Sequence, residues 1–154
     1  MTGPVPGGRR TGERGAVGGI EVLPFGLLVF VVAILLIANV WAVVDAKMTV
    51  DAAAREAGRA YVESGDAASA RVAARAAADD VARGAGRDPD RLDLRDDDPA
   101  FRRCEVVEHE ATYRVPALTL PFIGGFGEGF TVRGRHRERI DAFREGPAGR
   151  GDCT

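Results

Sequence analysis

The stretch VLPFGLLVFVVAILLIANVWAVV, at residues 22–44, decides the fold of this chain because it is apolar and carries no charged side chain. A bilayer's hydrocarbon core requires a helix of about 20 apolar residues, and this stretch is long enough to cross it. A buried helix of a soluble domain would show polar residues at the helical period, but here the polar groups are limited to Asn39 and the indole of Trp41. Trp41 lies near the end of the stretch, where indoles favour the membrane interface. We therefore predict a transmembrane helix.

The charges on either side of the span predict its orientation. Three arginines precede the span, whereas after it Lys47 is offset by Asp45 and Asp51. The positive-inside rule then places residues 1–21 in the cytoplasm as a basic leader, and residues 45–154 outside. The expected product is a single-pass protein of the cell membrane.

A cleaved signal peptide is an alternative to a permanent anchor. Positive residues precede the apolar stretch, and Val44-Asp45-Ala46 has small residues at a spacing that a signal peptidase could read. The apolar core of a signal peptide is usually about 7–15 residues long, however, and this one is much longer. The anchor is the better interpretation.

The composition leaves room for one small external domain. The chain has 154 residues and a formal net charge of −2, and we assign residues 45–146 to the domain and residues 147–154 to a flexible tail. This charge balance gives no indication of nucleic-acid binding. Two cysteines, Cys104 and Cys153, both fall on the predicted outer side, where a disulfide persists, so we predict that they are bonded.

The helical pattern continues beyond the span. From 47 to 62 the chain lacks proline, and small or apolar residues recur at helical spacing at Val50, Ala53, Ala54, Ala57 and Tyr61. Residues 64–66 break this helix, and Asp66 can cap a second one. The second helix carries a small-residue stripe and ends near Gly84; the stripe is Ala70, Ala73, Ala74, Ala77 and Val81.

Two stretches alternate as strands of an antiparallel hairpin, at residues 104–115 and 130–140. The connection between them is rich in glycine and proline and predicts a long flexible tip. If Val115 lies opposite Phe130, three further pairs follow: Glu110 with Arg135, Glu108 with Arg137, and His109 with His136. Leu92 and Leu94 suggest a short edge strand within an aspartate-rich loop. The predicted fold class is α+β: a transmembrane helix with a helical extension, a second short helix and a small antiparallel sheet.

The sequence contains no recognisable catalytic, cofactor or metal motif. The aspartate-rich stretch 84–100 lacks the spacing of a calcium loop, and the facing histidines lack an evident third ligand. The glycines at 124–129 join two predicted strands, whereas a phosphate-binding loop joins a strand to a helix. Neither Ser64 nor Ser69 lies in a nucleophile-elbow context. We predict a protein that is not an enzyme and holds no cofactor or metal.

Several stretches resemble a known family. They are ERGAVGGIEVLPFGLLVFVVAILLIANVWAVVDAK at 13–47, DAAAREAGRAYV at 51–62, YRVPAL at 113–118 and RHRERIDAFR at 135–144. The chain resembles TadE-like pseudopilins, membrane components of the tight-adherence (Tad, or Flp) pilus assembly machinery. Like type IV prepilins, it has a short basic leader, a glutamate at the start of the apolar helix and a helical extension rich in alanine and arginine.

The resemblance implies processing of the leader at Gly15 or Ala16. The prepilin pattern places a glutamate five residues after the glycine, whereas Glu21 follows Gly15 by six, and a cut after Ala16 restores the spacing. Glu21 would pair with the N-terminal amine of a neighbouring subunit inside the membrane, where an unpaired carboxylate is costly. Without the family, Glu21 is interpreted as an acid that caps the helix N-terminus.

The resemblance also implies a function and partners. The expected role is a non-enzymatic, membrane-anchored component of a tight-adherence pilus or secretion apparatus. Its expected partners are the lipid bilayer, other pilus or secretion subunits, and a prepilin peptidase. The alternative is a membrane-tethered external domain that binds a ligand or regulates a partner without entering a filament.

Overall fold

The structure is a computed structural model, and it describes residues 3, 22–97, 99–120, 122–127 and 129–153. The chain divides into two compact units, Met1–Ile37 and Ala38–Thr154. The predicted processing and assembly residues Gly15, Ala16 and Glu21 lie outside the described residues.

The first unit contains the beginning of α1 (Val22–Val62). In this part of the helix the large apolar side chains are exposed, among them Phe25, Leu28 and Phe30. None of the most apolar part of α1 is buried. By length and composition, α1 is long and apolar enough to cross a membrane. The predicted long apolar N-terminal helix is confirmed.

The second unit contains the rest of α1 and a second helix, α2 (Ala67–Gly84). All five residues predicted for the packed stripe of α1 are buried, from Val50 to Tyr61. Asp66 caps α2 as predicted, since its carboxylate accepts hydrogen bonds from the backbone N–H groups of Ala68 and Ser69 at 2.9 and 3.1 Å. This N-cap fixes the start of the helix.

The buried row of α2 differs from the predicted stripe. Ala70, Ala74, Ala78 and Ala82 are buried, at a spacing of four residues, whereas Ala73, Ala77 and Val81 are only half-buried. The predicted stripe therefore departs from the buried row at Ala73 and Ala77, whereas Val81, although half-buried, packs against the core. Beside this row, Arg75 donates hydrogen bonds to the backbone carbonyl oxygens of Leu92 in β1 and of Pro89, at 3.0 and 3.2 Å.

Three strands form the main sheet: β1 (Leu92–Asp96), β2 (Val106–Val115) and β5 (Phe130–Arg139), in the order β1-β2-β5. All pairings are antiparallel, and the short 3₁₀ helix η1 (Pro89–Arg91) precedes β1. The predicted register is confirmed, since Val115 pairs with Phe130 and His109 with His136. The α+β fold class and the edge strand at Leu92 are confirmed as well.

Two details of the hairpin differ from prediction. Cys104 and Glu105 precede β2 in a turn in which Cys104 has a positive φ of 67°, so the strand begins two residues later than expected. The connection contains a second hairpin, β3 (Leu118–Leu120) and β4 (Gly124–Phe126), where only a flexible tip was expected.

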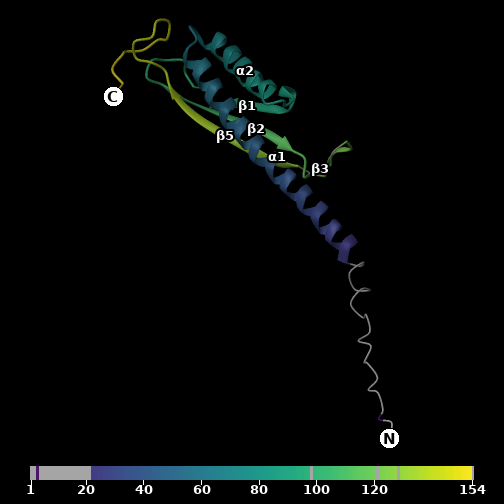
Figure 1. Cartoon of the computed structure of the whole chain (residues 1–154). Coiled ribbons are helices and arrows are strands. Elements are labelled where there is room, and N and C mark those ends of the chain that lie inside the picture. The colour runs from purple at the N-terminus through teal and green to yellow at the C-terminus, as the bar shows by residue number, and fades with distance from the viewer. Residues whose placement is uncertain (1–2, 4–21, 98, 121, 128, 154) are drawn as a thin grey trace. The chain divides into compact units, whose positions relative to one another are not determined.

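The domain has two layers (Figure 1). α1 packs across β5 in close contact. A Cβ atom added at Gly134 would lie 2.5 Å from the Val50 carbonyl oxygen, and one added at Gly58 would lie 3.2 Å from the His136 ring. α2 packs beside β1. The core between the layers consists mainly of alanine and valine side chains, and Tyr61, His109 and Ile140 are the largest of its fully buried side chains. The opposite face of the sheet has no covering layer among the described residues, and its side chains are polar.

Candidate functional site: the open face of the sheet

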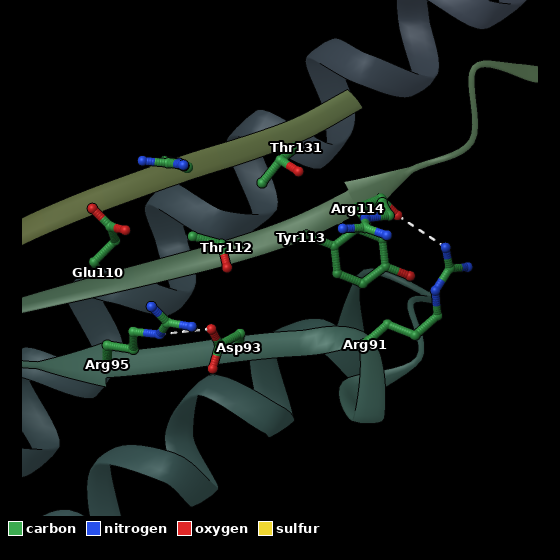
Figure 2. A pocket seen from close by; sticks show the side chains of 9 residues that line it. Arg91, Asp93, Arg95, Glu110, Thr112, Tyr113, Arg114 and Thr131 are labelled. Atoms are coloured by element: carbon green, nitrogen blue, oxygen red, sulfur yellow. Dashed lines mark hydrogen bonds and ion pairs between the residues drawn. The ribbon is translucent and has the colours of Figure 1, made fainter. Parts of the chain in front are cut away.

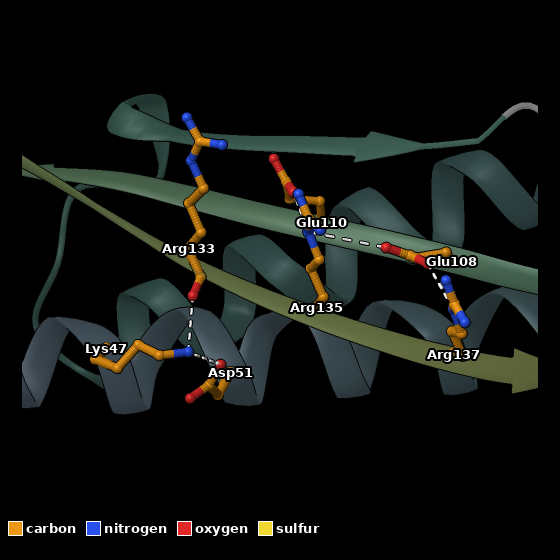
Figure 3. A network of polar contacts seen from close by, with 7 residues as sticks. All are labelled: Lys47, Asp51, Glu108, Glu110, Arg133, Arg135 and Arg137. Carbon is orange, nitrogen blue, oxygen red and sulfur yellow. Dashed lines mark hydrogen bonds and ion pairs between the residues drawn. The ribbon is translucent and has the colours of Figure 1, made fainter.

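Charged side chains from β2 and β5 cover the open face of the sheet (Figure 3). Arg137 bonds to the Glu108 carboxylate at 2.5 Å, and Arg135 bonds to the Glu110 carboxylate while lying 3.8 Å from Glu108. The hydrogen bond from Arg135 to Glu110 raises the pKa of Arg135. Exposed ion pairs stabilise little individually, so their main effect is to fix the positions of these guanidinium groups.

Lys47 of α1 is bonded to β5, the strand at the edge of the sheet. Its ammonium group donates a hydrogen bond of 2.7 Å to the carbonyl oxygen of Arg133 and pairs with Asp51 one turn along α1 (Figure 3). The Arg133 backbone is therefore held, while its guanidinium group projects onto the open face.

A shallow pocket of about 380 Å³ lies across β1, β2 and β5 (Figure 2). Within it, Arg91 donates a hydrogen bond of 2.9 Å to the carbonyl oxygen of Arg114, and its guanidinium carbon lies 5.4 Å from the centroid of the Tyr113 ring. The Arg87 guanidinium carbon lies 5.2 Å from the same centroid. The cation–π contact and the hydrogen bond to the Arg114 carbonyl thus hold the Arg91 side chain in place, and Arg87, which does not line the pocket, contacts the same ring.

The pocket is unevenly charged. Arg95 is paired with Asp93 at 2.8 Å, and Glu110 is paired with Arg135. By contrast, the guanidinium groups of Arg114 and Arg133 have no ion-pair partner among the described side chains. Guanidinium groups bind carboxylates and phosphates through paired N–H donors, so this pocket has the chemistry to bind an anion.

A histidine lies in the core beneath this face. His109 is 1% exposed, its ring centroid lies 5.2 Å from that of Tyr61, and neither ring nitrogen has a hydrogen-bond partner among the described residues. Burial lowers the pKa of His109. Its cross-strand neighbour His136 instead bonds through Nε2 to Glu138 at 2.8 Å. No group of three potential ligands capable of holding a metal ion occurs within the described part of the chain.

The two cysteines form a disulfide, with Cα atoms 5.2 Å apart. Around it, Arg103 donates hydrogen bonds to the carbonyls of Arg144 and Gly149 at 3.0 and 3.1 Å. Contacts with residues 102–104, which precede β2, thus hold the segment 147–153, which the sequence suggested as a flexible tail.

No family model, curated protein or solved structure matches this chain.

The pocket arginines were not singled out from the sequence, although a signal was present. The strand alternation places Arg114 and Arg133 on the polar face, together with the arginines that the predicted register pairs with glutamates. The same register leaves Arg114 opposite Thr131 and Arg133 opposite Thr112, without an acid. Counting the acids on that face would therefore have identified three arginines without a facing acid: Arg114, Arg133 and Arg139, which lies opposite Val106.

Proposed function

We propose that this chain is a non-enzymatic, membrane-anchored, pseudopilin-like component of a tight-adherence pilus or a related secretion apparatus. The observation that carries the proposal is α1, a single helix of 41 residues whose apolar beginning is exposed and whose later part packs against a sheet. The prepilin pattern that the sequence resembles requires this combination of an apolar helix and a helical extension.

The one long apolar helix of the described chain is compatible with a single-pass membrane protein. The charge asymmetry supports a cytoplasmic N-terminus and an external domain. The disulfide supports the same orientation, since such bonds persist in oxidising compartments outside the cytoplasm.

The roles of the two serines support a non-enzymatic protein. Ser64 Oγ donates to the carbonyl oxygen of Ala60 at the end of α1, and Ser69 Oγ bonds to the Asp66 carboxylate in the cap of α2. Both hydroxyl groups are thus engaged in hydrogen bonds at the helix termini.

The second candidate function is a tethered external domain that binds an anionic ligand outside any filament, and the arginine-lined pocket favours it. Dependence on a prepilin peptidase separates the two functions. We would produce the chain with and without a co-expressed prepilin peptidase and determine the N-terminal sequence of the membrane-bound product. A shortened N-terminus that appears only with the peptidase supports the pseudopilin function, whereas an unprocessed chain in both cases favours the tethered binding domain.

A further inference from the structure

Two exposed features occupy one end of the external domain. The first, which we call the basic rim, consists of Arg91, Arg114 and Arg133. The second, the apolar tip, consists of the exposed side chains around the β3–β4 hairpin and the start of β5: Phe122, Ile123, Phe126 and Phe130. Contacts with α1 show which end of the domain this is.

β5 runs in the same direction as α1. Arg133 is bonded to Lys47, a Cβ on Gly134 would touch Val50, and a Cβ on Gly58 would lie 3.2 Å from the His136 ring. Residue numbers therefore increase together along the two elements. Arg133 and Gly134, in the first half of β5, lie beside Lys47 and Val50, which follow the apolar stretch 22–44.

The remaining arginines lie at the same end. β2 is antiparallel to β5, so its last residues pair with the first residues of β5: Arg114 with Thr131 and Val115 with Phe130. Arg91 is bonded to the Arg114 carbonyl. Nearby, Arg87 bonds to the Ala42 carbonyl and the Asp45 carboxylate, at 3.2 and 2.7 Å, where the apolar stretch ends.

The apolar tip is unusually exposed for a domain with so small a core. Phe122 is fully exposed, Ile123 is 69% exposed and Phe130 is 59% exposed. Apolar patches of this kind mark contacts with a protein or a membrane. Aromatic side chains next to arginines are the combination that interfacial membrane contacts use, with the rings among the headgroups and the cations at the phosphates.

We propose that this end of the domain rests on the outer headgroup layer of the membrane that α1 spans. The apolar tip inserts between headgroups, and the guanidinium groups of the basic rim bind the phosphates of anionic phospholipids. This inference depends on the membrane anchoring proposed above but not on a role in a pilus. The anchor holds the rim close to the lipid at all times, so weak individual contacts are sufficient for the domain to stay seated.

Tryptophan quenching by brominated lipid tests the contact in the full chain. The test protein carries Trp41→Phe and Phe122→Trp, reconstituted in vesicles of equal parts phosphatidylglycerol and phosphatidylcholine, with the phosphatidylcholine brominated near the headgroup end of its acyl chains. We expect the emission of the tryptophan introduced at position 122 to shift to the blue and to be quenched. The matched control carries Trp41→Phe and Phe143→Trp, because Phe143 is also highly exposed but follows the other end of β5; we expect no quenching there.

The rim is tested by adding Arg114→Gln and Arg133→Gln to the Phe122→Trp protein. Near an anionic surface each arginine contributes enough attraction to change the ratio of seated to unseated domain about fivefold, so quenching should fall in vesicles with phosphatidylglycerol. Arg139→Gln with Arg150→Gln removes the same charge from the distal end and should leave quenching unchanged. Equal quenching at positions 122 and 143, or equal effects of the two arginine pairs, would overturn the proposal.

Quenching of Trp41 in the unmodified chain tests the membrane anchoring independently of the seated domain. Its single tryptophan, Trp41, lies at the end of the predicted span. Quenching of Trp41 without quenching at position 122 refutes the seated domain and retains the anchor. Absence of quenching at both positions refutes both.

Discussion

Gly134 of β5 packs so closely against Val50 of α1 that a Cβ atom at position 134 would lie 2.5 Å from the Val50 carbonyl oxygen. The backbone of the sheet therefore touches the backbone of the helix. Glycine is required at position 134 because there is no space for a Cβ atom, not because the backbone adopts a conformation that favours glycine. This contact fixes which part of α1 lies against β5. Because α1 covers this side of the sheet, the opposite side is the open face.

We expect Gly134→Ala to destabilise the domain by about 1–3 kcal/mol, because neither backbone can yield without moving a whole element. Gly84→Ala is the matched control, since a Cβ at Gly84 meets no atom within 4 Å. Urea unfolding of the full chain in detergent micelles, followed by circular dichroism, measures both. Equal midpoints for the two variants would show that helix and sheet are not in backbone contact.

The hairpin register was predictable from the sequence for a specific reason. Glu108 and Glu110 alternate with apolar residues on one strand, and Arg135 and Arg137 do so on the other, so only one in-phase pairing both buries the apolar face and matches the charges. The core row of α2 was not predictable in the same way. Alanine occupies most positions of that helix, so periodicity cannot separate Ala77 from Ala78.

The candidate site was only partly predictable. Strand alternation places several arginines on one polar face, but it treats Arg133 and Arg135 as equivalent. The predicted register separates them, because Glu110 lies opposite Arg135 whereas Thr112 lies opposite Arg133. The pocket also depends on Arg91, which reaches the Arg114 carbonyl oxygen from η1, and that contact has no signature in local sequence.

The buried histidine predicts acid sensitivity. Burial lowers the pKa of His109 in the folded state below its ordinary value, although the charges of Asp96 and Asp97 oppose the shift and His136 adds to it. The unfolded chain consequently binds a proton more readily, so stability falls as the pH drops below about 6.5, by at most about 1.4 kcal/mol per pH unit. The urea midpoint of the full chain, measured between neutral and mildly acidic pH, reports this slope.

His109→Phe should remove most of this slope, because a phenyl ring occupies the same core position without titrating. His136→Phe is the control, since His136 is half-exposed and bonds to Glu138. If His109→Phe retains the full pH dependence, other groups control the acid sensitivity.

The disulfide should stabilise the domain by lowering the conformational entropy of the unfolded chain. Cys104 and Cys153 are 49 residues apart, and closing a loop of this length restricts the unfolded chain by about 4 kcal/mol in the entropy model. We expect non-reducing peptide mapping to recover the Cys104–Cys153 cross-link, and Cys104→Ala with Cys153→Ala to unfold at lower urea concentration. Free thiols, or cross-links between chains alone, would contradict the intramolecular bond.

The charge asymmetry predicts the topology. A reporter that requires an oxidising compartment should be active when fused after Thr154 and silent when fused before Arg9, because three arginines lie in the short leader, whereas the first ten residues after the apolar stretch carry one basic residue, Lys47, beside two aspartates. Exchanging the three leader arginines for glutamine should weaken this preference. The reverse pattern of activity in the unmodified fusion would place the external domain and its cysteines in the cytoplasm.

Glu21 provides the sharpest test of the proposed function. Glu21→Ala should leave membrane insertion intact, since removing a charge beside the apolar stretch makes insertion easier. It should nevertheless impair subunit association or pilus production, because the proposed partner of this carboxylate is the amine released by cleavage near Gly15 or Ala16. A carboxylate that only caps the helix would contribute about 0.3–1 kcal/mol to local helix stability, and its removal would leave function nearly unchanged.

Glu13→Ala is the matched control for this experiment, because it removes the same charge from the part of the leader that processing would discard. The two variants are compared by pilus output and by the N-terminal sequence of the mature protein. A mature N-terminus at Ala16 or Val17, with a loss of output in Glu21→Ala alone, supports the pseudopilin mechanism. An N-terminus at Met1 or Thr2 with normal output in both variants refutes it. That result would leave the proposed membrane anchor unaffected, since it depends on the apolar helix rather than on the fate of the leader.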